Sequence, residues 1–253
     1  EYMENNSLAR ALFGRQGQKL QLNWATRHNI CLGIARGLAF LHEESTLKIV
    51  HRDIKATNVL LDKDLNPKIS DFGLARLDEE ENTHISTRIA GTIGYMAPEY
   101  ALWGYLTHKV DVYSFGVVAL EIVSGKNNND PGARDNCFCL LDWACYLNRT
   151  GNIIDVVDMA LRDDLNKEEV ERMLKVVILC TKTSPALRPS MSEVVAMLEG
   201  QLAVPEDISD DSIYSEDLKF KAMRGVEVVR RDQSSSSNET SSLLIRSYPF
   251  SDN

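Results

Sequence analysis

The chain has 253 residues, of which 43% are hydrophobic and 26% are charged, a composition typical of one globular domain. The formal net charge of −9 argues against nucleic acid or an anionic membrane surface as the main partner. The five cysteines are odd in number and contain no C-x-x-C pair, which favours reduced thiols over a disulfide framework or a zinc site.

The first strong periodicity lies in residues 24–44, where apolar side chains recur at helical spacing: Ile30, Ile34, Leu38 and Leu41. This spacing predicts a long helix with one buried face, and Asn23 is a suitable N-cap for it. We expect Arg27, His28 and Arg36, on the other face, to be exposed to solvent.

Two acids and an amide follow this helix at fixed offsets, within "HRDIKATNVLL" at 51–61 and "DFG" at 71–73: Asp53, Asn58 and Asp71. Short alternating runs after Asn58 and before Asp71 predict two strands joined by a tight turn. The three side chains would then surround one small volume. Their oxygens suit a hard divalent cation such as Mg²⁺, and Asp53 suits the acceptance of a proton from a hydroxyl. The pattern is typical of phosphoryl transfer.

The polar stretch between Asp71 and Glu99 has no strong periodicity, and loops of this length are usually functional or disordered. We interpret its acidic run at 78–81 as a solvated surface rather than a docking site. Residues 109–126 are then apolar on nearly every side and end near Gly125, a natural C-cap, which predicts a buried helix. The longest apolar run in this helix is too short to span a membrane and contains Glu121.

After a loop at 127–139, helical periodicity returns at 140–147 and 170–178. Ser190 and Glu193 have the spacing of a capping box at the start of a last helix. Beyond about residue 202 the composition becomes acidic and then serine-rich. Such a segment buries too little apolar surface to offset its chain entropy, so we expect residues 203–253 to form a disordered tail.

The order and spacing of "HRDIKATN", "DFG" and "APE", the last at 97–99, resemble the protein kinases. The phrases "GTIGYMAPEY" and "DVYSFGVVALEIVSGK" are similar to those of plant receptor-like kinases of the leucine-rich-repeat class, which are related to Pelle. The resemblance implies a mainly α fold, namely a kinase C-terminal lobe with short β-strands around the catalytic loop. That lobe would cover residues 1–202 from the hinge onward, with the N-terminal lobe absent.

The resemblance implies that Asp53 is the catalytic base, that Lys55 neutralises charge on the transferred phosphoryl group and that Thr92 supports them. The implied cofactors are ATP and Mg²⁺ or Mn²⁺, with the metal ion held by Asn58 and Asp71. The residues implied to contact the nucleotide are Glu1, Met3, Ser7, Lys55, Asn58, Leu60 and Asp71. For residues 1–8, a generic polar turn accounts for the same composition.

Other motif residues are implied to have structural roles: Phe72, Gly73, Glu99, Asp111 and Arg188. Arg188 is expected to pair with Glu99, and Asp111 to hold the backbone of the catalytic loop. Asp111 is also an ordinary acid at a helix N-terminus, where the macrodipole favours it, and the two roles are compatible. Arg52 is expected to bind a phosphate on the activation segment. The candidate phosphorylation sites, in order, are Thr87, Ser86 and Thr83.

The implied function is transfer of the ATP γ-phosphoryl group to protein serine and threonine hydroxyls in receptor signalling, since Lys55 is typical of serine/threonine kinases. The implied partners are protein substrates and co-receptor kinases, with no nucleic acid and no direct membrane insertion by this chain. A longer parent receptor would place the domain on the cytoplasmic side of the plasma membrane, and the chain alone would be cytoplasmic. Without an N-terminal lobe we expect the chain to be inactive alone. The alternative is a non-catalytic lobe that acts as a binding or decoy module.

Overall fold

The computed structural model describes residues 2–15, 17, 19–78, 89–129, 137, 139–205 and 243–245. Predictions for Glu1, Thr83, Ser86 and Thr87, and for most of the tail, concern residues outside these ranges. The described part is mainly helical, as the sequence predicts, with a few strands of two or three residues each.

Seven α-helices are described: α1 (Leu8–Phe13), α2 (Trp24–Ala39), α3 (Pro98–Trp103), α4 (Lys109–Ser124), α5 (Leu140–Arg149), α6 (Lys167–Cys180) and α7 (Met191–Leu198). A π-helical turn (Phe40–Glu44) extends α2, so the helix predicted for 24–44 is present with a changed last turn. Short 3-10 helices of one or two turns form many of the connections: Ala56–Asn58, Phe72–Leu74, Ile153–Val156, Met159–Asp164 and Pro185–Leu187.

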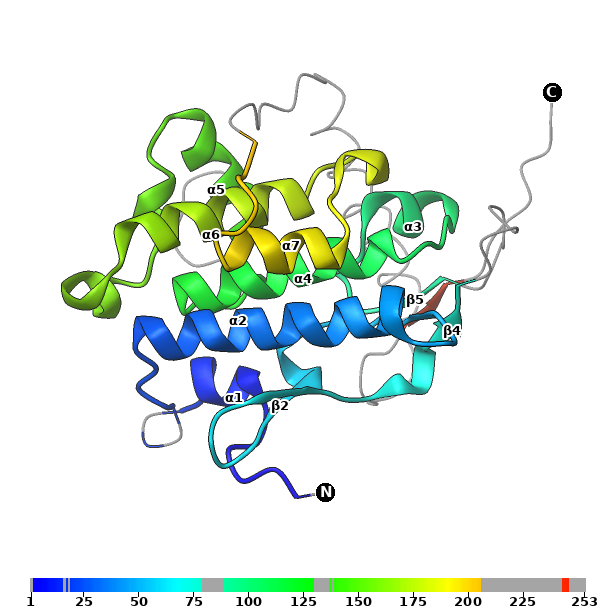
Figure 1. The fold of residues 1–253 in the computed structure, drawn as a ribbon, viewed down its shortest axis with the longest axis horizontal. Coiled ribbons are helices and arrows are strands. Elements are labelled where there is room, and N and C mark those ends of the chain that lie inside the picture. The colour runs from blue at the N-terminus through cyan, green and yellow to red at the C-terminus, as the bar shows by residue number, and fades with distance from the viewer. Residues whose placement is uncertain are drawn as a thin grey trace, which may run out of the picture.

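Helix α4 forms the centre of the core. Every residue of it from Val110 to Ser124 is buried, because neighbouring helices cover all its faces. It packs against α2, α5 and α6, and α2 packs in turn against α7. Figure 1 shows α4 lying between α2 and the pair α6 and α7. The helix ends at Gly125, which has the left-handed φ of +64° expected of a C-cap glycine.

The helix ends follow the predicted capping chemistry. The Asn23 side chain accepts a hydrogen bond from the Thr26 amide at 2.9 Å at the start of α2. At α7 the Ser190 amide donates to Glu193 Oε2 at 2.7 Å while the Glu193 amide donates to Ser190 Oγ at 3.3 Å, which completes the capping box. None of the five cysteines, all of which lie in the described ranges, is part of a disulfide, in agreement with the prediction of reduced thiols.

The prediction of an exposed Arg27 is wrong. Its side chain is 3% exposed and donates to the Leu22 carbonyl at 3.0 Å, the Ile122 carbonyl at 2.8 Å and Asp158 Oδ2 at 2.7 Å. The guanidinium therefore joins α2 to the end of α4 and to a loop before α6. Helical periodicity identified the apolar face of α2 but gave no information on which polar residue another element would cover.

Within the described ranges, six short strands form three antiparallel pairs. They are β1 (Ile49–Val50) with β4 (Arg76–Leu77), β2 (Val59–Leu61) with β3 (Pro67–Ile69), and β5 (Ile89–Gly91) with β6 (Leu243–Ile245). The β2–β3 hairpin is the pair predicted around Asn58. Strand β6 lies within the stretch expected to be a disordered tail. That expectation stays a prediction for residues 206–242 and 246–253, which lie outside the described ranges.

Candidate active site

The β2–β3 hairpin brings two of the predicted ligand residues to one end of a sheet. Val59 pairs with Ile69, so Asn58 and Ser70 lie at the same end of the hairpin. The Ser70 amide and hydroxyl both donate to the Asn58 carbonyl, at 2.9 and 2.8 Å. Because Asp71 follows Ser70 directly, Asn58 and Asp71 lie at the same end of the hairpin.

The Asp53 carboxylate lies in a compact hydrogen-bonded cluster. Thr92 donates its hydroxyl to Asp53 Oδ1 at 2.7 Å, and Lys55 Nζ donates to Asp53 Oδ2 at 2.8 Å and to Thr92 Oγ1 at 2.9 Å. The Asn58 amide nitrogen also donates to Asp53 Oδ2, at 3.1 Å. Asp53 is 8% exposed, so its orientation is fixed while an opening to solvent remains. The structure thus brings together all three side chains predicted to be catalytic.

Asp111 fixes the main chain of the predicted catalytic loop at His51 and Arg52. It is fully buried at the start of α4 and accepts hydrogen bonds from the His51 amide at 2.7 Å and the Arg52 amide at 2.8 Å. His42 Nε2 lies 3.0 Å from the same carboxylate. These contacts hold Arg52 at a left-handed φ of +72°, a conformation that residues other than glycine adopt rarely. A favourable interaction of Asp111 with the dipole of α4 does not by itself account for its hydrogen bonds to the His51 and Arg52 amides.

His51 joins the catalytic loop to the strand that carries Asp71. Its Nδ1 accepts a hydrogen bond from the Asp53 amide at 3.3 Å, and its Nε2 lies 3.0 Å from the Ser70 carbonyl. A neutral ring with the proton on Nε2 satisfies both contacts. The edge of Phe72 packs against the same ring, with the centroids 4.8 Å apart. His51 therefore couples the positions of Asp53 and Asp71.

The oxygens of Asn58 and Asp71 fit a magnesium ion. Asn58 uses its amide nitrogen on Asp53, which directs its Oδ1 away from that carboxylate. Asp71 is exposed, and within the described residues its carboxylate accepts one hydrogen bond, from the Gly73 amide at 3.4 Å. In the same ranges no group of three or more His, Cys, Asp or Glu side chains is arranged to bind a metal. Two protein ligands together with substrate phosphates are a usual set for Mg²⁺.

The segment before α1 lies along β2, beside Leu60. Ser7 forms an isolated β-bridge with Leu60, and the Leu61 amide donates to the Asn6 carbonyl at 2.8 Å. Ser7 also caps α1 by accepting from the Arg10 amide at 3.3 Å. Ser7 and Leu60, both predicted to contact the nucleotide, are thereby paired at this edge of the hairpin. Met3 precedes them in the same segment and accepts a hydrogen bond from the Asn6 amide at 3.1 Å, whereas Glu1 lies outside the described residues.

Arg188 and Glu99 form the predicted ion pair, which is bidentate and buried. The two guanidinium nitrogens lie 2.6 and 2.7 Å from the two carboxylate oxygens. The remaining N–H groups donate to the carbonyls of Lys182, Thr183 and Lys109 at 2.7, 3.0 and 3.0 Å. Every donor of the guanidinium is therefore satisfied, which is the condition under which a buried ion pair is tolerated.

The Arg52 side chain, predicted to bind a phosphate, points toward the "APE" helix. Its guanidinium donates to the Tyr100 hydroxyl through Nε at 3.1 Å and through a terminal nitrogen, and to the Leu74 carbonyl at 3.1 Å. It is 7% exposed. The candidate phosphorylation sites Thr83, Ser86 and Thr87 lie outside the described residues, so the pairing with phosphate stays a prediction.

Sequence reasoning missed a buried acid below the segment that carries Thr92. Glu121 Oε1 accepts hydrogen bonds from the Tyr95 hydroxyl at 2.7 Å and the Asn128 amide at 2.9 Å. Its other oxygen is buried without a partner among the described atoms. Burial raises the pKa of Glu121 to about 7, although both hydrogen bonds lower it. Burial, followed by the charge of Glu121, raises the pKa of Tyr95 far above its ordinary value. The sequence signal that could have predicted this buried acid is the position of Glu121 within the otherwise apolar run at 116–123.

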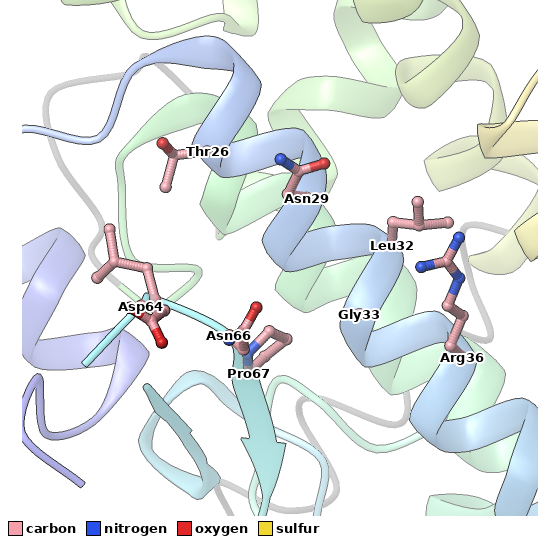
Figure 2. Close-up of a pocket in the computed structure, with 9 residues that line it drawn as sticks. Thr26, Asn29, Leu32, Gly33, Arg36, Asp64, Asn66 and Pro67 are labelled. Carbon is pink, nitrogen blue, oxygen red and sulfur yellow. The ribbon is translucent and has the colours of Figure 1, made fainter. Parts of the chain in front are cut away.

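A polar hollow lies at the opposite end of the β2–β3 hairpin from Asn58. Figure 2 shows Asp64 and Asn66 of the hairpin turn and Pro67 of β3 beside α2, from which Thr26, Asn29, Gly33 and Arg36 also line the hollow. The close approach requires Gly33, since a Cβ atom there would lie 2.5 Å from Pro67 Cγ. In the turn itself, hydrogen bonds from Asn66 lower the pKa of Asp62. This hollow is separate from the acids at the other end and carries none of the predicted catalytic side chains.

No described helix is long and apolar enough to cross a membrane.

Residues 1–198 match the family model for protein tyrosine and serine/threonine kinases. Among Arabidopsis thaliana proteins, RFK1 is 58% identical over 252 residues, which is 99% of this chain and 24% of that relative. At1g53440 is 62% identical over 226 residues, which is 88% of the chain and 22% of that relative. Both are named probable LRR receptor-like serine/threonine-protein kinases. The chain thus spans about a quarter or less of the length of these curated relatives.

Proposed function

Because the chain belongs to the protein tyrosine and serine/threonine kinase family, we propose that its Asp53 cluster transfers the γ-phosphoryl group of ATP to serine and threonine hydroxyls of proteins. The observation that carries this proposal is the joint hydrogen bonding of Asp53, Lys55 and Thr92. It supplies a fixed carboxylate, a neighbouring cation and a hydroxyl that locks their geometry.

In the proposed reaction a substrate hydroxyl approaches Asp53, which orients the hydroxyl and accepts its proton. The hydroxyl oxygen bonds to the γ-phosphorus while the bond from that phosphorus to the β–γ bridging oxygen breaks, and ADP leaves with the bond's electron pair. Lys55 offsets the charge that develops on the transferred group. Thr92 holds one carboxylate oxygen of Asp53, and Asn58 contacts the other. The carboxylate is therefore positioned before the substrate arrives, which lowers the entropic part of the barrier.

The nucleotide is proposed to lie over the Asn58 end of the hairpin, with the adenine toward Met3 and Leu60. Asn58 and Asp71 would hold Mg²⁺ or Mn²⁺, which neutralises charge on the phosphate oxygens when it is bound. The support is the pairing of Ser7 with Leu60 on the hairpin that leads to the two proposed ligand residues.

We propose that the chain is the C-terminal lobe of a receptor-like kinase and that protein substrates and co-receptor kinases are its partners. The names of the relatives and the share of their length that the chain covers support this assignment. Such a receptor would present the domain at the cytoplasmic side of the plasma membrane. The proposed divisions are a kinase domain at 1–202 and a tail at 203–253.

The test compares residues 1–253 with a chimera in which the N-terminal lobe of RFK1 is joined ahead of residue 1. We expect the chimera, in ATP and Mg²⁺, to phosphorylate serine or threonine in a generic protein substrate and 1–253 alone to be inactive. Asp53→Asn should lower kcat by roughly 10²–10⁴-fold. Thr92→Ser keeps the hydroxyl and should retain most activity, whereas Thr92→Ala should not.

Equal activity of the chimera and its Asp53→Asn variant would overturn the proposed role of Asp53. A folded chimera with no transfer to any protein hydroxyl would instead favour a non-catalytic binding or decoy module. Circular dichroism and urea unfolding of each variant separate loss of chemistry from loss of folding.

A further inference from the structure

Strand β5 carries a second strand that comes from the far end of the chain. Leu243–Ile245 pair antiparallel with Ile89–Gly91, in the register Gly91↔Leu243, Ala90↔Leu244 and Ile89↔Ile245. Figure 1 shows this pair beside β4, at the end of the molecule that carries α3. The two strands are more than 150 residues apart in the sequence, so their contact is purely tertiary.

The register determines which residues of β6 bond to β5. The Ala90 amide donates to the Tyr100 hydroxyl at 3.1 Å, and this hydroxyl donates back to the Ala90 carbonyl at 3.2 Å. Pairs in an antiparallel ladder alternate between hydrogen-bonded and non-hydrogen-bonded. With the main chain of Ala90 engaged by Tyr100, the bonded pairs are Ile89↔Ile245 and Gly91↔Leu243. The pair Ala90↔Leu244 lies between them.

Strand β5 leads directly into the proposed catalytic cluster. Thr92 is the next residue after Gly91, and its hydroxyl donates to Asp53 Oδ1. A Cβ atom at Gly91 would lie 3.0 Å from the Arg52 carbonyl, so the C-terminal end of β5 passes close to the catalytic loop. Because the pairing is antiparallel, the end of β6 nearest this loop is Leu243. An extended chain paired with β5 therefore runs along a strand whose C-terminal end leads to Asp53.

We propose that β5 is a docking strand for an extended peptide and that Leu243–Ile245 of this chain is its resident occupant, held as a pseudosubstrate. The inhibitory part rests on the proposed kinase function, since the same edge would receive an extended protein substrate. Recognition is through main-chain hydrogen bonds, as in β-strand addition. Strand β6 also covers the edge of β5, whose free N–H and C=O groups would otherwise be open to pairing with other chains.

Tethering favours the tail over a free peptide. The tail segment is linked covalently to α7 through residues 199–242, and a covalent link replaces the bulk concentration of a peptide with an effective local concentration, on the order of millimolar or below. A protein substrate must therefore outcompete a local occupant, or the tail must be released first. Occupancy of β5 would appear as a raised KM for protein substrate with little change in kcat.

The first test measures amide hydrogen exchange in residues 1–253. Ile245→Pro removes a main-chain donor that bonds to β5, whereas Leu244→Pro is the matched control, because proline is tolerated in edge strands where its nitrogen is not a ladder donor. We expect the Ile89 and Gly91 amides to exchange at least tenfold faster in Ile245→Pro than in the wild type. Leu244→Pro should resemble the wild type. Urea unfolding should be unchanged in both variants.

Equal exchange of these amides in the wild type and Ile245→Pro would overturn the docking proposal, as would equal acceleration by both prolines. The second readout is binding of a fluorescent peptide with the sequence of residues 239–249, followed by anisotropy. We expect it to bind Ile245→Pro more tightly than the wild type, in which β5 is occupied. Neither readout requires catalysis, so the docking result stands apart from the proposed kinase function.

The inhibitory role is tested in the RFK1 chimera. Ile245→Pro should lower KM for a protein substrate severalfold with kcat unchanged, and Leu244→Pro should leave both unchanged. An unaltered KM in Ile245→Pro, together with faster exchange at β5, would overturn the pseudosubstrate role while leaving the docked strand in place.

Discussion

The buried charges beneath residues 51–58 and the acids of the proposed active site are held in opposite ways. Asp111 is fully buried, accepts two main-chain amides and contacts His42, and Arg188 has a partner for each guanidinium donor. Asp71, by contrast, is exposed and has one weak hydrogen bond within the described residues. Asp53 is intermediate, since side chains hold it and yet it reaches the surface.

This difference separates positioning from chemistry. A charge in the framework is stabilising only if protein groups satisfy it completely, because a buried unsatisfied group is costly. A side chain that must bind a cation or accept a proton needs free acceptor capacity. We therefore expect framework substitutions to change the free energy of unfolding strongly and substitutions on the reacting face to change it little.

The largest effect is expected from Arg188→Ala. It leaves the Glu99 carboxylate buried without its cation and removes three further hydrogen bonds to carbonyls, so unfolding should become easier by about 3–5 kcal/mol. Arg36→Ala is the matched control. Arg36 pairs with Glu199, but its side chain is 60% exposed, and exposed pairs contribute about 0–1 kcal/mol. Equal urea midpoints for the two variants would contradict the framework role of Arg188.

The next effect is expected from Asp111→Ala, which leaves the His51 and Arg52 amides without an acceptor. Each buried unsatisfied donor costs about 1–3 kcal/mol, so we expect a loss of about 3 kcal/mol in urea unfolding. Asp111→Asn keeps one acceptor oxygen and should be intermediate. The control is Asp64→Ala at the exposed hairpin turn, which should change stability by less than about 0.5 kcal/mol. A loss no larger than this control would refute the clamp on the catalytic loop.

A pH-dependent effect is expected from Glu121. Its pKa in the folded chain, about 7, is above the ordinary value of 4.5. The folded state thus keeps a proton that the unfolded chain has lost, and the stability from this group falls as pH rises from about 4.5 to 7. The full difference is about 3 kcal/mol. Glu121→Gln removes this dependence.

Urea unfolding of the wild type and of Glu121→Gln at pH 5 and pH 8 measures this pH-dependent contribution of Glu121 to the free energy of unfolding. The variant should gain stability relative to the wild type between the two pH values by most of that amount. Glu171→Gln, at an exposed acid on α6, is the control and should show no such change. A constant difference between the wild type and Glu121→Gln at both pH values would show that Glu121 does not take up a proton on folding.

The smallest effect on stability is expected from Asp71→Asn. Asp71 has a left-handed φ of +64°, which Asn tolerates, and its carboxylate is exposed. Stability should change by less than about 0.5 kcal/mol, while Mn²⁺ binding in the presence of ATP, measured in the RFK1 chimera by electron paramagnetic resonance, should weaken at least tenfold. Unchanged Mn²⁺ affinity would remove Asp71 from the proposed metal ligands.

The sequence alone predicted the helices at α2, α4, α5, α6 and α7, the hairpin around Asn58 and the capping box of Ser190. These features depend on periodicity and on contacts between neighbours in the chain. It also indicated Asp53, Asn58 and Asp71, because motif spacing is a property of the chain itself. The expected pairing of Arg188 with Glu99 came from the family resemblance.

Only the tertiary structure decided which polar groups other elements cover. It buried Arg27 against Asp158, joined Arg52 to Tyr100, placed Glu121 below Tyr95 and paired β6 with β5. Each of these contacts joins residues far apart in sequence or on different elements. The physical reason is that burial and partnership belong to the packed arrangement of elements. Local spacing specifies which face of a helix is apolar but not which distant group will meet its polar side.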